Sequence, residues 1–263
     1  MRYIWVALAA LLAVVPTASA ETVVSSNVLA DTDWTAGGSP YVVTREVRVR
    51  FNSTLTMGEG VEVRFESGAG LATDDGSSIV VAGSRSLPVL LTSASPAPAE
   101  GDWEGLEVYS SPGSSFTHAV FEYAATCLEL NVSDSAVDHC VFRDSQTGLR
   151  CLRSSPEVIG CSFTGHSAAG IHCWSRESLP TIDDSNFSDN LWNVYLSSYA
   201  PPVVTINAEG NWWGTSEEAA IMAGIYDRED TAALYGLVDY DPWLGGEPVE
   251  RSTWGGIKGL FRE

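Results

Sequence analysis

Lysine is almost absent from this sequence. Lys258 is the one lysine in 263 residues, and 14 Lys and Arg residues face 34 Asp and Glu residues, which gives a net charge of −20. Proteins bind nucleic acids and anionic membranes by neutralising phosphates with Lys and Arg. We therefore expect no nucleic-acid partner. The same charge predicts repulsion from a polyanion such as pectate unless divalent cations bridge the two.

Long apolar runs are absent beyond the N-terminus. The one long run, Ile4–Val15, follows Arg2 and precedes Ala18-Ser19-Ala20, an arrangement typical of a signal peptide and its cleavage site. A membrane anchor is the alternative, but the run is short for a membrane span. We expect residues 1–20 to be removed, which leaves 13 bases against 34 acids and a net charge of −21. The mature protein is then expected to be secreted, periplasmic or at the cell surface, with no membrane insertion after cleavage.

Paired cysteine motifs are also missing. Five cysteines occur between residues 127 and 173, and none forms a CxxC pair. A zinc or haem site is therefore not expected.

A repeat is present in the middle of the chain. Four phenylalanines, Phe121, Phe142, Phe163 and Phe187, mark units of 21 to 24 residues. Each unit contains two short runs that alternate between apolar and polar residues, with Gly, Ser, Asp and Asn between them. The first runs are 116–121, 137–142, 158–163 and 182–187, and the second are 127–130, 148–151, 170–173 and 193–196.

Stacked units of this kind predict an all-β fold, a single right-handed parallel β-helix with two short strands per unit. The alternation points these residues inward: Val137, Cys140, Phe142, Leu149 and Cys151. One inward column then holds Ala119, Cys140, Cys161 and Ser185, and another holds Leu130, Cys151, Cys173 and Leu196. We expect core thiols. The alternative is disulfides Cys140–Cys161 and Cys151–Cys173, because neighbouring rungs bring their Cα atoms within bridging range.

The flanking segments extend the same architecture. Roughly eight rungs are predicted between Tyr41 and Trp213 at the strand spacing of a sheet. A helix is predicted from Glu217 to Asp227, with Thr215 or Ser216 as its N-cap. We expect one domain over residues 21–245, capped by about residues 211–245, and a flexible tail over 246–263. Earlier strands are predicted at Tyr41–Val43, Glu46–Phe51, Val61–Phe65, Ile79–Val81 and Val89–Leu91.

Several motifs resemble a known family. They are Ser39-Pro-Tyr-Val-Val43, Gly101-Asp-Trp-Glu-Gly-Leu106, the Phe-marked rungs and Asn211-Trp-Trp-Gly-Thr215. On these residues the chain resembles the bacterial right-handed β-helix repeat proteins of the pectate-lyase-like superfamily, over about residues 30–245. The resemblance implies an exported β-helix. It does not select a function, because the fold carries polysaccharide lyases, glycosidases and adhesins alike.

No convincing catalytic group emerges from the sequence. A lyase of this fold needs a Lys or Arg base beside a carboxylate-held cation, and the predicted solenoid has no lysine. Arg150 shares an outward column with Glu129, His172 and Tyr195, which predicts an ordinary Glu129–Arg150 ion pair. A glycosidase needs two carboxylates, and Asp183 with Asp184 is the most suitable pair. Alternation points these two apart, however, and a corner shared with His118 and His139 explains Asp184.

Metal and ligand sites were considered in the same way. No metal ligand set is predicted, and calcium remains a weak alternative, because no acidic group has the spacing of an EF-hand loop. Trp174, Trp192 and Tyr195 are candidate ligand-binding residues, because flat aromatic faces suit sugar rings. Glu129, in the same outward column as Tyr195, is the fourth candidate. The acidic groups considered for calcium are Asp74-Asp75, Asp227 with Asp230, and Asp239 with Asp241.

Three functions follow from these observations. The first is a non-catalytic exported β-helix that binds a polysaccharide or a protein at the cell surface. The second is a polysaccharide lyase or glycoside hydrolase that uses residues around Arg150, His172 and Asp183. The third is a structural or assembly module of the cell envelope, with residues 250–263 as a short basic attachment tag. The sequence leaves the ligand and the oligomeric state open.

Overall fold

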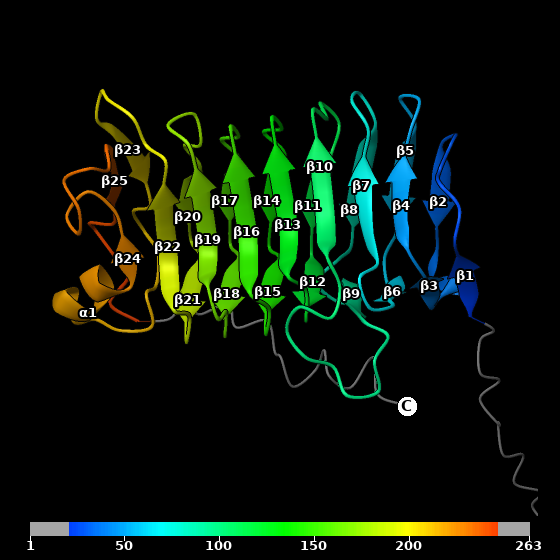
Figure 1. Cartoon of the computed structure of the whole chain (residues 1–263). Coiled ribbons are helices and arrows are strands. Elements are labelled where there is room, and N and C mark those ends of the chain that lie inside the picture. The colour runs from blue at the N-terminus through cyan, green and yellow to red at the C-terminus, as the bar shows by residue number, and fades with distance from the viewer. Residues whose placement is uncertain (1–20, 247–263) are drawn as a thin grey trace, which may run out of the picture.

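The fold is a parallel β-helix, shown in Figure 1 as a row of stacked turns. The structure is a computed structural model that describes residues 21–246. The predicted signal peptide, residues 1–20, and residues 247–263 of the predicted tail lie outside this range. Within it, 8-, 8- and 9-stranded parallel sheets form the three sides of the solenoid, which we name sheets I, II and III.

Each complete turn contributes one strand to each sheet. Sheet I contains β1 (Thr22–Val24), β3 (Tyr41–Val43), β6 (Glu62–Phe65), β9 (Val89–Ser93), β12 (Ala119–Glu122), β15 (Val141–Arg143), β18 (Ser162–Thr164) and β21 (Asn186–Ser188). Sheet II contains β4 (Glu46–Val49), β7 (Gly70–Thr73), β10 (Gly105–Tyr109), β13 (Thr126–Asn131), β16 (Thr147–Leu152), β19 (Ala169–Trp174), β22 (Trp192–Ser197) and β24 (Ile225–Tyr226). Sheet III contains β2 (Thr32–Trp34), β5 (Thr54–Met57), β8 (Ser78–Ala82), β11 (Ser115–Thr117), β14 (Ala136–Asp138), β17 (Glu157–Ile159), β20 (Thr181–Asp183), β23 (Val204–Asn207) and β25 (Gly236–Asp239).

The prediction of two strands per unit is wrong, because each unit has three. The run from Phe116 to Phe121 bends at His118, so that β11 lies in sheet III and β12 in sheet I. His118 has a φ of 47°, and the equivalent corners at His139 and Asp184 have φ of 51° and 49°. His and Asp adopt this left-handed conformation more readily than most residues do. The shared corner predicted for these three residues is confirmed.

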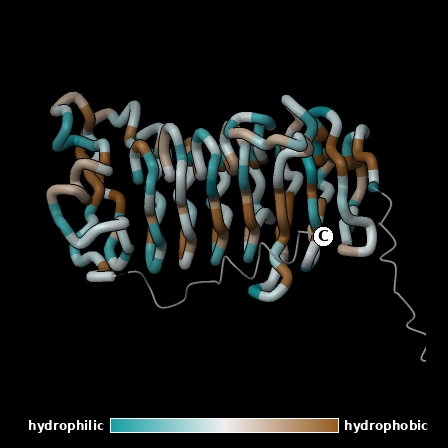
Figure 2. Tube along the Cα trace, turned by 90° about the horizontal axis from the view of Figure 1, so that it is seen from below, coloured by the Kyte–Doolittle hydropathy of each residue, from teal (hydrophilic) through white to brown (hydrophobic). Residues whose placement is uncertain are grey.

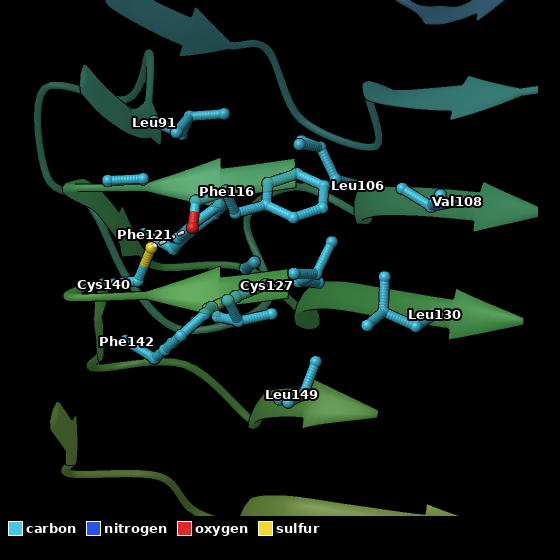
Figure 3. Close-up of a cluster of buried hydrophobic side chains, with 14 of the residues drawn as sticks. Leu91, Leu106, Val108, Phe116, Phe121, Cys127, Leu130, Cys140, Phe142 and Leu149 are labelled. Atoms are coloured by element: carbon cyan, nitrogen blue, oxygen red, sulfur yellow. Dashed lines mark hydrogen bonds between the residues drawn. The ribbon is translucent and has the colours of Figure 1, made fainter. Parts of the chain in front are cut away.

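The core is a ladder of aromatic rings. Strand pairing places Phe121, Phe142, Phe163 and Phe187 in register on consecutive turns. Their ring centroids are 4.9, 4.9 and 5.1 Å apart and the planes are within 10° of parallel, while Trp213 closes the ladder 4.8 Å beyond Phe187. Figure 3 shows Phe121 and Phe142 among the aliphatic side chains that fill the same interior. Hydrophobic and hydrophilic residues are interspersed along the chain of each turn (Figure 2).

The five cysteines line the interior as free thiols. Cys140 and Cys161 lie on adjacent turns of one column, and Cys151 pairs in register with Cys173 on the other. All five side chains are fully buried. Burial raises the pKa of the Cys127 thiol to about 12, so that it stays protonated and unreactive. The columns predicted from the repeat are confirmed, and the structure contains neither of the alternative disulfides.

This arrangement predicts how the thiols will react. Because every sulfur is buried, we expect a water-soluble thiol reagent to modify none of them in the native protein at pH 7. After unfolding in denaturant without reductant, we expect all five to react. Counting the released chromophore checks this. A count of one or three after unfolding would show that disulfides had formed.

The C-terminal helix is shorter than predicted. Helix α1 spans Glu218–Ala223, and Gly224 ends it, so that Ile225 and Tyr226 form β24 instead of a last helical turn. Glu217 is the N-cap and makes no side-chain capping bond, whereas Thr215 Oγ1 accepts a hydrogen bond from the Glu217 backbone N–H at 3.1 Å. The predicted helix to Asp227 and its predicted N-cap are therefore wrong. A short 3₁₀ helix, η1 (Ala36–Gly38), lies near the other end.

The solenoid also begins earlier than predicted. β1 starts at Thr22 and pairs with β3, so that the first turn precedes Tyr41. The predicted strands near Tyr41, Val61, Ile79 and Val89 are present, and the one predicted to reach Phe51 ends at Val49. Among residues 21–246, no helix has the length and apolar character needed to span a membrane.

Candidate binding face

The outer face of sheet II carries one column of outward positions, most of which hold ionisable or aromatic side chains. Its neighbours along each strand, such as Leu128 and Leu130 beside Glu129, are fully buried, so that the residue between them points outward. The predicted column of Glu129, Arg150, His172 and Tyr195 is confirmed by strand register. Pairing extends it in both directions, and we call the full set the sheet II column: Arg48, Ala72, Glu107, Glu129, Arg150, His172, Tyr195 and Tyr226.

A pocket of about 350 Å³ opens over the middle strands of sheet II. Its floor is backbone, because Gly70 of β7 pairs with Gly105 of β10. Gly105 has a φ of +121°, and a Cβ there would lie 1.6 Å from the carbonyl oxygen of Thr126. No other residue fits this position, so the hollow is built into the fold. The ionisable side chains that line it are Glu46, Glu104, Glu107, Glu129 and Arg150.

The carboxylates in this pocket have different surroundings. Glu129 Oε2 accepts a hydrogen bond from Arg150 Nη1 at 3.1 Å, which confirms the predicted ion pair. Glu46 Oε1 lies 2.6 Å from Arg48 Nε. Glu107, between these pairs, accepts no hydrogen bond from a side chain among residues 21–246. Burial raises the pKa of Glu107, the negative charge of Glu129 raises it further, and the more distant Arg48 opposes both.

The other end of the column is aromatic. His172 stacks on Trp174 with centroids 6.0 Å apart and meets the edge of Tyr195 at 5.0 Å. Trp192 lies 5.2 Å from Tyr226, which stacks on Tyr195 at 5.0 Å. Trp174 is 46% exposed, so that its ring is available to a ligand. The structure thus brings together the three predicted aromatics and adds Tyr226.

His172 stays neutral at physiological pH. Burial, helped by the charge of Arg150, lowers the pKa of His172 to about 4. Its Nε2 lies 2.8 Å from Ser197 Oγ. The neutral imidazole, held by this contact, lies between the charged and the aromatic parts of the face.

Asp183 does not belong to this face. It lies exposed on β20 of sheet III, whereas Arg150 and His172 lie on sheet II. Asp183 Oδ1 accepts a hydrogen bond from the backbone N–H of Asp184 at 3.0 Å, an ordinary corner contact. The predicted grouping of Arg150, His172 and Asp183 is therefore wrong, because the chain turns between β19 and β20 and places Asp183 on another side of the solenoid.

The acidic groups considered for calcium have structural contacts. Arg50 Nε and Arg48 Nη1 lie 2.7 and 3.3 Å from Asp74, and the hydrogen bond from Arg50 lowers the pKa of Asp74. Asp227 is buried and accepts the backbone N–H groups of Glu229 and Val238 at 2.8 and 2.9 Å. Asp75, Asp230, Asp239 and Asp241 are exposed. Among residues 21–246, no three His, Cys, Asp or Glu side chains are grouped to hold a metal ion.

Sequence reasoning missed the N-terminal half of the column. The signal was present, because Gly105-Leu-Glu-Val108 alternates in the same way as Cys127-Leu-Glu-Leu130. The Phe-marked repeat begins only at residue 116, so that Glu107 was not aligned with Glu129. The loop between β9 and β10 (residues 94–104), which leaves the row of turns in Figure 1, interrupts the spacing.

Comparison with known proteins gives one match. A family model described as a pectate-lyase-like beta helix domain matches residues 3–118. Together with the parallel solenoid, this match confirms the resemblance drawn from the sequence motifs. No curated protein and no solved structure matches the chain.

Proposed function

We propose that this chain, which is similar to pectate-lyase-like β-helix proteins and folds as a parallel solenoid, is an exported protein that binds a neutral polysaccharide. The observation that carries the proposal is the sheet II column, which joins the pocket and its four glutamates to the aromatic end of the same face. We call this aromatic end, formed by Trp174, Trp192, Tyr195 and Tyr226, the aromatic platform. An extended chain of sugars lies along a face of this shape more readily than a compact ligand does.

Charge selects among polysaccharides. A net charge of −20 and four glutamates in the pocket repel a uronic-acid polymer. Neutral sugars offer hydroxyl groups, which donate hydrogen bonds to carboxylates, and C–H faces, which pack on aromatic rings. The residues with which we propose the sugar makes contact are Glu107, Glu129, His172, Trp174, Trp192 and Tyr195.

The proposed location is outside the cytoplasm. The signal-peptide pattern before residue 21 supports export. A protein ligand at the cell surface is the competing occupant of the same face. It is favoured less because four like-charged carboxylates line the pocket, and Asp and Glu are depleted in the cores of protein interfaces.

The test is binding of the purified chain to a panel of polysaccharides. We expect affinity for at least one neutral glucan, xylan or mannan and none for polygalacturonate without calcium. Isothermal titration with soluble hexasaccharides of the same sugars measures the affinity. Binding of polygalacturonate alone, or of no glycan in the panel, would contradict the proposal.

Trp174→Ala is expected to weaken glycan binding at least about tenfold, because an exposed aromatic ring at the centre of an interface commonly contributes more than 1 kcal/mol. Phe51→Ala is the matched control. Phe51 is 71% exposed and follows β4, away from the aromatic end of the column, so its loss leaves the affinity unchanged. Equal affinities for the two variants would show that the ligand does not use the aromatic platform.

A further inference from the structure

We propose that Glu107 and Glu129 form a catalytic carboxylate pair that hydrolyses the bound neutral glycan with retention of anomeric configuration. This inference rests on the proposed function, because it concerns the same face, and goes beyond binding. The sequence alone did not suggest the pair, since Glu107 lies before the visible repeat.

The first step of the argument is geometric. Glu107 and Glu129 are direct partners in the pairing of β10 with β13, and both side chains line the same pocket. Adjacent parallel strands are about 4.8 Å apart. Retaining glycosidases hold their two carboxyl groups about 5–5.5 Å apart, and inverting enzymes about 6.5–9.5 Å apart. The backbones of the two glutamates are therefore one strand spacing apart, which is nearer to the retaining separation than to the inverting one.

The second step is the difference between the two environments. Arg150 Nη1 donates a hydrogen bond to Glu129 Oε2 at 3.1 Å, which fixes the position of the side chain that acts as the nucleophile. Glu107 has no such donor among residues 21–246. The negative charges of Glu129 and Glu46 act on it, and Arg48, on the far side of Ala72, opposes them. The raised pKa of Glu107 fits the role of a proton donor.

The third step is the chemistry. Glu107 donates its proton to the glycosidic oxygen while a Glu129 oxygen attacks the anomeric carbon. The C–O bond breaks, one sugar leaves as an alcohol, and the other remains as a glycosyl ester on Glu129. Glu107, now a carboxylate, takes a proton from a water molecule whose oxygen attacks the anomeric carbon and displaces Glu129. Two inversions give net retention, and both side chains return to their starting protonation states.

The arrangement of the face supports a substrate that crosses this pair. The backbone floor at Gly70 and Gly105 lets a sugar ring come close to the sheet beside Glu107. The aromatic platform lies beyond Arg150 and His172 on the same column, where it holds the next sugars of the chain. Binding away from the reacting bond then positions that bond over the carboxylates.

The experiment uses soluble hexasaccharides of β-1,4-linked glucose, xylose and mannose with the purified chain. Reducing-end assay measures release, proton NMR of the first product assigns the anomer, and titration calorimetry measures binding separately. We expect release with retention. Glu107→Gln and Glu129→Gln are each expected to reduce it at least about 100-fold. Glu157→Gln, an exposed glutamate on sheet III, is the matched control and is expected to keep full activity.

Each result decides a different point. Binding without release overturns the catalytic inference and leaves the proposed function standing. Release with inversion, or release that survives either Gln variant, also overturns it. Absence of both binding and release overturns the inference and the proposed function together. Circular dichroism and thermal unfolding of the Gln variants distinguish loss of chemistry from loss of fold.

In addition, azide is expected to restore turnover of an activated aryl glycoside by Glu107→Ala and to give a glycosyl azide of retained configuration.

Discussion

Phe142→Ala is expected to lower the free energy of unfolding by about 3–5 kcal/mol, the range for removing a fully buried phenylalanine ring. The ring lies between Phe121 and Phe163, 4.9 Å from each, so that its loss leaves a cavity and breaks two stacking contacts. Stacked turns bury the core only through their neighbours, so a gap in the middle of the ladder weakens both halves of the solenoid. Equilibrium unfolding in urea, followed by tryptophan fluorescence, measures the change.

Phe51→Ala controls for the chemistry of this substitution. It removes the same side chain from an exposed position, where changes are usually within about 0.5 kcal/mol. A loss below about 1.5 kcal/mol for Phe142→Ala would mean that neighbouring turns close the gap. A comparable loss at Phe51 would mean that the aromatic ladder is not the main source of stability.

The ladder was predictable because its signal repeats. Phe121, Phe142, Phe163 and Phe187 recur at nearly constant spacing, and alternation from each one assigns the inward side of its strand. The sides of the solenoid were not predictable in this way. A corner such as His118 shifts the alternation by one residue, so that Phe116 and Phe121 both point inward although they are five residues apart. This shift marks a bend inside a run that was interpreted as one strand.

The candidate site could likewise be predicted only in part, because its residues also had to be assigned to a side of the solenoid. Glu129, Arg150, His172 and Tyr195 were placed in one column because they occupy equivalent positions of aligned repeats, and the structure confirms it. Asp183 was added because its position is outward. Outward positions occur on all three sides of the solenoid, so this alone does not place it beside Arg150. Glu107 was left out because residues 94–104 break the spacing before the repeat begins. A site is defined by the side of the solenoid on which its residues lie and by the register of their strands. The sequence predicted the register only within the regular repeat.

The interior also contains a histidine that makes folding depend on pH. His166 is 1% exposed, its Nδ1 donates a hydrogen bond to the carbonyl oxygen of Ser145 at 3.1 Å, and its Nε2 has no partner among the described residues. Protonation would therefore bury an uncompensated charge. Burial lowers the pKa of His166 to about 4 from its ordinary 6.5, although the charges of Asp144 and Glu100 and hydrogen bonding to backbone oppose the shift.

Between pH 6.5 and about 4 the unfolded chain binds a proton at His166 and the folded chain does not. The stabilising effect of a neutral His166 is thus complete above pH 6.5 and is lost as the pH falls toward 4, where the folded state also takes up the proton. A shift of this size corresponds to about 2–3 kcal/mol of unfolding free energy between pH 7 and pH 4.5.

Other groups titrate over the same range, so the measured quantity is the difference in unfolding free energy between the protein and its His166→Asn variant, from urea unfolding at both pH values. We expect the variant to be less stable at pH 7, through lost packing, and the gap to shrink by about 2–3 kcal/mol at pH 4.5. A constant gap for His166→Asn would mean that the buried imidazole takes up its proton without unfolding the solenoid.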